Sequence, residues 1–349
     1  MAALGVTAAN DIASLALIWY VRGKTLSQTT YDKPLLAWLM KGKKTFASGN
    51  KQISEPIQGV YMSDTPGFLQ GISGDDSITY NAASNALRAV YNWYETIASL
   101  WITWTDLLID GISIFDDTKG GRQSEHSEAT MTRITGLLEN RLDDFGESRS
   151  RARSDMFWGD GSQDSKQVPG VTALFPDSGQ GVVGGISGVT NAWWRNRVNL
   201  ALVASPSNST LIQFFNSELV QLKLYGGRPN KWVAGSAFLD AVRSELFAKG
   251  YFTQTGFMGE KATDLGMGGI HISGIGKCEF EPTLDRKGLG KRSYIFDGRR
   301  FRLRPMEMES NKVLAPERPY NYLVFLHNVK DTEGLEVTQR YGSGVYSLA

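Results

Sequence analysis

Cysteine and histidine are scarce in this sequence. Among its 349 residues, Cys278 is the one cysteine, and the three histidines are His126, His271 and His327. One cysteine excludes an internal disulfide framework and any metal site built from several cysteines. Three scattered histidines leave little for a zinc site or for histidine-centred acid–base catalysis. We therefore predict no catalytic residues, no metal and no cofactor.

Long apolar runs are missing as well. Near the start, the longest one covers residues 12–21 and is interrupted by Ser14. A bilayer core needs roughly 20 apolar residues, so this run is too short to cross a membrane. A secretory signal carries basic residues ahead of its apolar stretch, whereas the first basic residue here, Arg22, follows it. We expect an intracellular protein with no membrane partner.

Neither sign of charge dominates. Thirty-seven lysines and arginines stand against 36 aspartates and glutamates, which gives a net charge of +1. This balance argues against one continuous nucleic-acid clamp, although local basic stretches remain open. Glycine, by contrast, is abundant at 38 residues, and aromatic residues make up 11%, with nine tryptophans. The composition is typical of a protein that works through surfaces, turns and packing.

Helical periodicity marks several segments. The clearest lies over residues 124–158, where Met131, Ile134, Leu138 and Leu142 begin a stripe of apolar side chains at steps of three and four. Shorter helices are predicted over residues 11–22, 33–44, 207–225 and 236–249. The long segment predicts a helix of perhaps eight turns with charged residues along its remaining faces.

Strand signals lie between and after these helices. Residues 52–61 predict a strand, and Pro56 within it indicates a sheet edge or an isolated ribbon. Residues 68–72 predict its return, so that 51–80 would form a hairpin-like excursion that needs support from elsewhere. Other strands are expected within 86–114, at 232–235 and from 251 onwards. Because strands and helices do not alternate regularly, we predict an α+β fold.

Two adjacent tryptophans, Trp193 and Trp194, raise the alternative of a carbohydrate-active hydrolase. Such an enzyme would need a pair of carboxylates beside the indole rings. Asp143 and Asp144 do not form such a pair, because adjacent side chains on a helix point in different directions. We favour a structural role as packing or interface anchors for both tryptophans, and likewise for Trp158.

Basic residues concentrate between positions 286 and 304, where Asp297 is the one acid. Interleaved aromatic residues are typical of a groove that binds single-stranded nucleic acid, so nucleic-acid binding stays open as an alternative function. Alternation over residues 300–304 predicts a strand with one solvated, arginine-bearing face, which favours ion pairing between subunits. The candidate residues for contact with another subunit or with DNA are Arg286, Arg292, Arg299, Arg300, Arg302 and Arg304.

Two segments resemble the major capsid proteins of tailed double-stranded DNA bacteriophages. In that family the long spine helix commonly ends in an apolar-Gly-Asp-Gly turn, which is similar to Trp158 and residues 159–161, followed by an apolar segment, here 168–174. Residues 184–198 are similar to the Gly-Gly-Ile…Trp-Trp-Arg-Asn segment of many phage coat proteins. The order of the predicted elements matches this family over essentially the whole chain.

The resemblance implies the fold shared by tailed-phage and herpesvirus capsids. It divides the chain into an N-terminal arm (1–50), an extended β-hairpin loop (51–80), a peripheral domain with the long spine helix (81–175 and 315–349) and an axial domain (176–314). The arm and the loop would lap over neighbouring subunits. The loop residues expected at that interface are Tyr61, Asp64, Phe68, Asp75 and Asp76.

The function that the resemblance implies is structural. The chain would assemble into pentamers and hexamers of an icosahedral shell that encloses the double-stranded DNA genome. It would be made in the host bacterial cytoplasm and reside in the virion capsid. We expect no scaffolding region ahead of the arm, and residues 52–80 contain no lysine for covalent crosslinking. The implied partners are further copies of itself, a portal protein, a separate scaffolding protein, a decoration protein and packaged DNA through nonspecific contact.

Overall fold

The computed structural model describes residues 29–64, 68–78, 80, 86–103, 105, 128–248, 270–272, 276–314 and 324–349. The predicted helix over 11–22 lies outside these residues. Chain contacts divide the protein into two units. One comprises Met1–Tyr31, Ser99–Arg151 and Ala315–Asn328, and the other comprises Asp32–Ala98, Ala152–Leu314 and Val329–Ala349.

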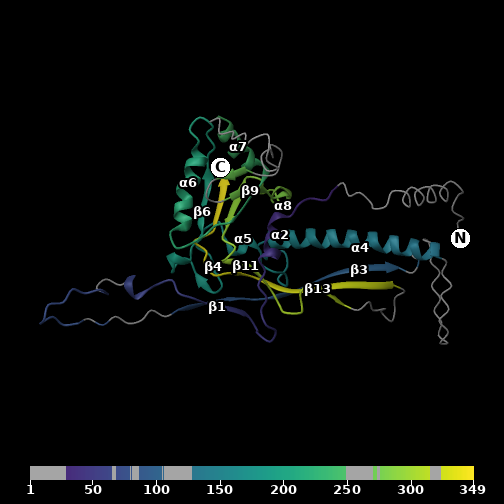
Figure 1. The fold of residues 1–349 in the computed structure, drawn as a ribbon, viewed down its shortest axis with the longest axis horizontal. Coiled ribbons are helices and arrows are strands. Elements are labelled where there is room, and N and C mark those ends of the chain that lie inside the picture. The colour runs from purple at the N-terminus through teal and green to yellow at the C-terminus, as the bar shows by residue number, and fades with distance from the viewer. Residues whose placement is uncertain are drawn as a thin grey trace, which may run out of the picture. The chain divides into compact units, whose positions relative to one another are not determined.

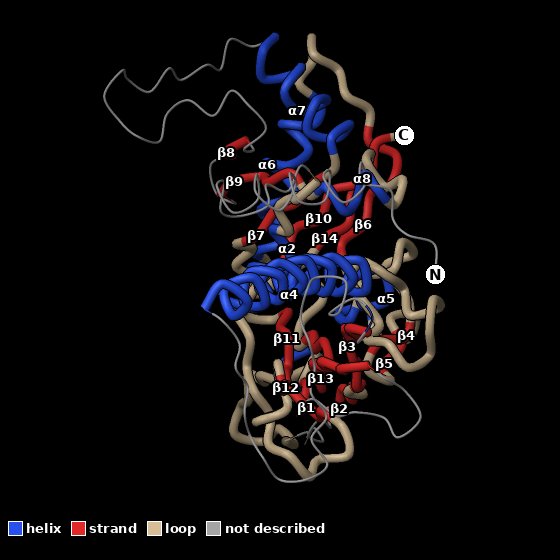
Figure 2. The backbone as a smooth tube through the Cα atoms, turned by 90° about the vertical axis from the view of Figure 1, so that its right-hand side faces the viewer, coloured by secondary structure: helices blue, strands red, loops and turns tan. Residues whose placement is uncertain are grey.

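A six-stranded mixed sheet forms the centre of the second unit. Its order is β6-β14-β10-β7-β9-β8. The strands are β6 (Arg197–Leu202), β7 (Lys231–Ala234), β8 (Ile270–Ile272), β9 (Gly276–Phe280), β10 (Arg292–Phe296) and β14 (Gly344–Leu348). β14 pairs parallel with β6 and antiparallel with β10, so it lies inside the sheet, as Figure 2 shows. The predicted strand at 232–235 is confirmed as β7.

Two amphipathic helices pack on this sheet, α6 (Thr210–Lys223) and α7 (Ser236–Ala248). Phe215 of α6 is 1% exposed, and its ring lies 5.0 Å from that of Trp232 and 5.9 Å from that of Phe238. At the start of α6, the buried carboxylate of Glu245 accepts the backbone N–H groups of Leu211 and Ile212, which would otherwise lack partners. The helices predicted over 207–225 and 236–249 are thereby confirmed.

A second sheet has the order β11-β13-β12, and β3 also pairs with β13. Its strands are β3 (Tyr94–Thr103), β11 (Phe301–Pro305), β12 (Lys312–Leu314) and β13 (Val324–Val337). β11 and β13 run antiparallel, with Phe301 opposite Val337 and Pro305 opposite Glu333. The strands predicted near 300–304 and within 86–114 are therefore present.

The predicted long helix is confirmed as α4 (Glu128–Phe157), which is 30 residues long. Its apolar end enters the core, because Phe157 and Trp158 are 0% and 1% exposed. Gly161, in the turn that follows, has a φ of +88°, a conformation that favours glycine. A Cβ on Gly170 would lie 2.3 Å from the Phe157 carbonyl oxygen, so the chain after the helix can return only through a glycine.

The short helix predicted over 33–44 is confirmed as α2 (Pro34–Lys41), whose Leu35 and Leu39 are buried. The Leu35 N–H at its start donates to Oε2 of Glu281 over 3.0 Å. The Glu281 residue is 0% exposed, and burial raises the pKa of its carboxyl group. Another short helix, α8 (Pro282–Arg286), follows directly.

The hairpin-like excursion is longer than predicted. β1 (Ile53–Ile57) pairs antiparallel with β2 (Leu87–Tyr91), with Ile53 opposite Tyr91. The return strand predicted at 68–72 is wrong, because the described residues 68–78 contain bends and turns and no strand. Ladder pairing forms where side chains can be buried, and Ala89 and Tyr91 are buried whereas Phe68, Leu69 and Ile72 are exposed. Figure 1 shows the long excursion between β1 and β2.

Strand pairing connects segments that the sequence assigned to different domains. β14, expected in the peripheral domain, lies in the six-stranded sheet, while β11 and β12, expected in the axial domain, belong to the sheet of β13. The division into arm, loop, peripheral domain and axial domain stays a prediction.

Candidate functional site

The segment between β1 and β2, residues 58–86, is called the loop from here on. Its described apolar side chains are largely in solvent: Leu69 is 92% exposed and Tyr80 is 87% exposed. The others in this group are Val60, Tyr61, Phe68, Ile72 and Ile78. Exposed apolar side chains that gather on one segment mark a surface for another protein.

The acidic residues predicted at the interface are also exposed, and two of them close turns. An Asp64 carboxylate oxygen accepts the Tyr61 N–H over 2.8 Å, and an Asp76 oxygen accepts the Ser73 N–H over 2.8 Å. Asp75 is exposed beside Asp76. Each carboxylate keeps acceptor capacity for an outside partner, so the loop presents negative charge together with apolar side chains.

Trp193 holds the loop at its base. A Cβ on Gly59 would lie 1.9 Å from Cδ2 of Trp193, so the indole ring occupies the space that a side chain would need. Gly59 stands two residues after the end of β1. The direction in which the loop leaves the strand is therefore limited by the position of this ring.

Trp194 and Trp158 are each 1% exposed. The Trp194 Nε1–H donates to the carbonyl oxygen of Val183 in β4 (Val182–Val183), which forms a small hairpin with β5 (Ile186–Ser187). The Trp158 ring lies 5.0 Å from that of Tyr294 in β10. Neither ring presents a free face on which a sugar could stack.

The structure separates the arginines that the sequence grouped. Arg292 forms a two-pronged pair with Asp177, over 2.7 and 2.6 Å. Arg304 is 8% exposed and lies 2.8 Å from Glu336 and 3.1 Å from Glu55. The prediction of a solvated arginine face is therefore wrong at Arg304. Glu336 in strand β13 supplies a carboxylate that is buried together with the Arg304 guanidinium group.

Arg286, Arg299 and Arg300 are exposed, and Arg302 is half-buried. Arg299 donates to the carbonyl oxygen of Gly226 over 3.0 Å. Contact of any of these arginines with another subunit or with DNA stays a prediction.

Sequence reasoning missed the residues that join Arg299 and Arg300 on the surface. Lys223 is exposed at the end of α6, and Tyr225 and Arg228 are exposed in the turn that follows the helix and lies beside Arg299. The signal available in the sequence was a Gly226–Gly227 turn followed by an arginine at the end of an amphipathic helix.

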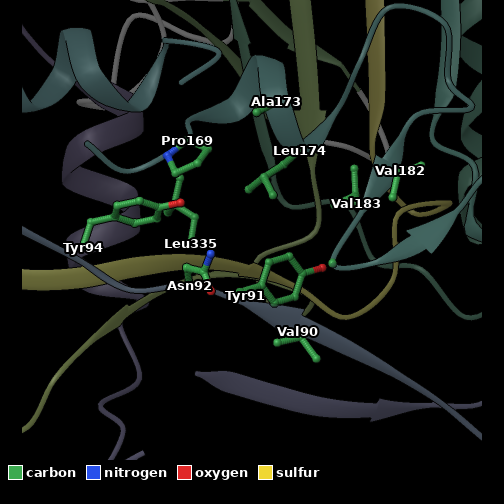
Figure 3. Close-up of a pocket in the computed structure, with 11 residues that line it drawn as sticks. Val90, Tyr91, Asn92, Tyr94, Pro169, Ala173, Leu174, Val182, Val183 and Leu335 are labelled. Atoms are coloured by element: carbon green, nitrogen blue, oxygen red, sulfur yellow. The ribbon is translucent and has the colours of Figure 1, made fainter. Parts of the chain in front are cut away.

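A cavity of about 180 Å³ lies beside the end of β2 that is away from the loop, and Figure 3 shows the side chains that line it. Its lining comes from β2, from α5 (Val171–Leu174) and from β4, with Tyr91, Leu174 and Val183 among the side chains. The Tyr91 hydroxyl donates to the Val337 carbonyl oxygen over 2.7 Å, and burial raises the pKa of that hydroxyl group. The cavity offers space for packing rather than a group poised for proton transfer.

The described part of the chain contains neither a candidate metal site nor a candidate membrane-spanning helix. Its histidines, cysteines and acids form no cluster of three or more that could hold a metal ion. Within the same residues, no helix is long and apolar enough to cross a membrane.

Comparison with known proteins gives no match to a family model and no match to a curated protein. Solved structures do match. The capsid asymmetric unit of cyanophage A-1(L) is 11% identical, with 93% of this chain and 94% of that chain covered and a TM-score of 0.59. The capsid of an empty GTA particle is 15% identical, with 95% and 96% covered and a TM-score of 0.56.

A structure from Mycobacterium phage Ogopogo is 12% identical, with 93% and 95% covered and a TM-score of 0.52. The chain thus has the fold of phage and GTA capsid chains over nearly its whole length. The prediction of an α+β fold of the tailed-phage major-capsid type is confirmed.

Proposed function

We propose that this protein is the structural subunit of an icosahedral shell that encloses the double-stranded DNA genome of a tailed bacteriophage. The observation that carries the proposal is the capsid fold, which extends over 93% of the chain in the cyanophage comparison. The exposed apolar loop supports it independently, because such a segment gains buried surface only against another molecule.

Self-association is the activity of the loop in this proposal. Residues 58–86 are enough chain for two limbs of roughly 14 residues, each of which could span at most about 50 Å. One copy uses its loop on a neighbour and receives the loop of another copy elsewhere. Head-to-tail contacts of this kind close into rings, which suits pentamers and hexamers. Tyr61, Asp64, Phe68, Asp75 and Asp76 contribute to that contact.

The same proposal extends to location and partners. The subunit is assembled in the host bacterial cytoplasm and resides in the virion capsid. A portal protein occupies one vertex, a separate scaffolding protein guides assembly, and a decoration protein reinforces a shell without covalent crosslinks. Packaged DNA makes nonspecific contacts with the inner surface.

This role is structural rather than enzymatic. The hydrolase alternative loses its main support, because Trp194 is 1% exposed and the Trp193 ring is packed against Gly59. The nucleic-acid alternative is weakened at Arg292 and Arg304, whose guanidinium groups are already paired with carboxylates of the same chain.

Electron microscopy of the protein expressed with its scaffolding protein tests the proposal. We expect closed particles from the full chain. Deletion of residues 59–75 should leave a folded chain by circular dichroism that forms no particles, because β1 and β2 lie outside the deletion. A full chain that stays strictly monomeric at high concentration would contradict the proposal.

A further inference from the structure

Three turns that are distant in the sequence meet on the surface of the second unit. They are residues 223–230, 297–300 and 338–341. Arg299 donates to the Gly226 carbonyl oxygen over 3.0 Å, and the Arg228 N–H donates to Asp297 over 2.7 Å. The Thr338 N–H donates to the Arg300 carbonyl oxygen over 2.8 Å. These bonds fix the turns as one surface.

Aromatic contacts and a buried cation stabilise the same place. The rings of Tyr225 and Tyr341 meet edge to face with centroids 4.8 Å apart. Next to Tyr341, Arg340 is 0% exposed and donates to the carbonyl oxygen of Trp194 over 2.9 Å. The surface therefore rests on a fixed base rather than on a free loop end.

The exposed charge of this surface is positive. Within the three turns, all of which the structure describes, the one acid is Asp297, and it is 0% exposed. Its carboxylate already accepts the N–H groups of Arg228 and Arg299. Lys223, Tyr225, Arg228, Arg299, Arg300 and Tyr341 are called the basic patch from here on.

The loop has the complementary character. Residues 58–86 contain Asp64, Asp75 and Asp76 and neither lysine nor arginine. Its exposed Leu69 and Ile72 supply apolar surface next to these charges. The patch offers apolar surface of its own, since Tyr225 is 60% exposed and the neighbouring Leu224 is 58% exposed.

We propose that the basic patch of one copy receives the acidic loop of a second copy. The inference deepens the proposed function and rests on it. A peptide segment that carries carboxylates among apolar side chains fits both the arginines and the exposed Leu224 and Tyr225. A DNA backbone would satisfy the arginines and leave the apolar surface without a partner.

A charge exchange tests this contact. Arg228 and Arg300 are the residues whose charge is reversed. The Arg299 side chain is kept, because it donates a hydrogen bond to the Gly226 carbonyl oxygen that a substitution would remove. Arg228→Glu/Arg300→Glu should weaken self-association by about tenfold or more, since it places like charges across the interface. Asp75→Arg/Asp76→Arg should do the same, and Asp76→Asn, which keeps an oxygen to accept the Ser73 N–H, measures the effect of that turn contact alone. The variant that carries all four changes should recover most of the lost association.

The controls separate this inference from the proposed function. Lys41→Glu/Lys166→Glu makes the same charge change at exposed sites outside the patch and should assemble like the wild type. All variants are first matched to the wild type by circular dichroism. Self-association is measured by light scattering and by particle counts in electron micrographs.

Normal assembly by Arg228→Glu/Arg300→Glu would overturn the inference and leave the proposed function standing. A second result would also overturn the inference: Arg228→Glu/Arg300→Glu loses assembly, the added Asp75→Arg/Asp76→Arg change does not restore it, and the arginine variant also loses double-stranded DNA binding in a filter assay. The basic patch would then be a DNA-binding surface. A wild type that never assembles would instead remove the proposed function itself.

Discussion

Apolar side chains have opposite environments in the α6–sheet layer and in the loop. Phe215 is 1% exposed and contacts the rings of Trp232, Phe238 and Tyr346. Leu69 is 92% exposed. Burial in the first region stabilises the single chain, whereas the second region can gain the same hydrophobic free energy only in an assembly. In the proposed function, folding and assembly therefore depend on separate sets of apolar residues.

The largest effect on stability should come from Phe215→Ala. It removes a ring that several aromatic side chains enclose, and Phe→Ala changes in cores cost about 3–5 kcal/mol. Urea denaturation monitored by circular dichroism measures the free energy of unfolding. Val220→Ala on the same helix is the matched control, because Val220 is 65% exposed. Equal losses in the two variants would contradict the assignment of core and surface on α6.

Gly59→Ala probes the border between the two regions. Its Cβ would meet the Trp193 ring at 1.9 Å, so the ring or the loop must move. Overpacking of this kind costs about 1–3 kcal/mol. We expect a lower melting temperature and fewer particles. Trp193→Ala should cost less in the Gly59→Ala background than alone, as a double-mutant cycle would reveal. Additive losses would mean that the ring does not restrain the loop.

A smaller effect concerns Glu281, the buried carboxyl group at the start of α2. Because its pKa is raised in the folded protein, the folded state binds more protons than the unfolded one just above the unfolded pKa of about 4.3. The contribution of Glu281 is thus full below that pH and is lost as pH rises through the folded pKa.

Glu281→Gln keeps an acceptor for the Leu35 N–H and removes the titration. Its stability relative to the wild type should therefore increase as pH rises from about 4 through the raised pKa. Urea denaturation at a series of pH values measures the trend, with the exposed Glu307→Gln as the control for loss of a carboxylate. A difference that does not change with pH would show that folding leaves the pKa of Glu281 unshifted.

Leu69→Ser should have the smallest effect on stability. Its effect on assembly should nevertheless be large. Substitutions at exposed positions usually change the free energy of unfolding by less than about 0.5 kcal/mol. The particle yield should nevertheless fall, because the side chain is available for a partner. Lys166→Ser, at an exposed position outside the loop, should change neither quantity. An unchanged yield from Leu69→Ser would remove Leu69 from the assembly surface.

Periodicity predicted the elements whose side chains divide cleanly between core and solvent. α4, α6 and α7 were found this way, and Pro56 correctly placed β1 at an edge. The prediction of a return strand at 68–72 was wrong because these residues have apolar composition without a core to face. Whether an apolar segment is buried depends on the rest of the fold, so a local pattern does not distinguish this exposed segment from a strand.

The candidate site was predictable only where its residues are neighbours in the sequence. Arg299 and Arg300 were singled out by a basic stretch, but the same stretch included Arg292 and Arg304, whose partners Asp177 and Glu336 are distant in the chain. The basic patch combines three turns, and the contact between Trp193 and Gly59 joins two more segments. Such sites depend on long-range folding, so no single window of sequence contains them.

The position of β14 has a consequence for the order of events during synthesis. This strand pairs with β6 through Gly344 and Arg197, so the sheet closes only after nearly all of the described chain has been made. Contacts this distant in sequence form slowly. The turn at 338–341 precedes β14 directly, so the basic patch is also completed late. In the proposed contact, a nascent chain on the ribosome thus displays its loop long before its basic patch is complete, which would keep neighbouring nascent chains from joining prematurely.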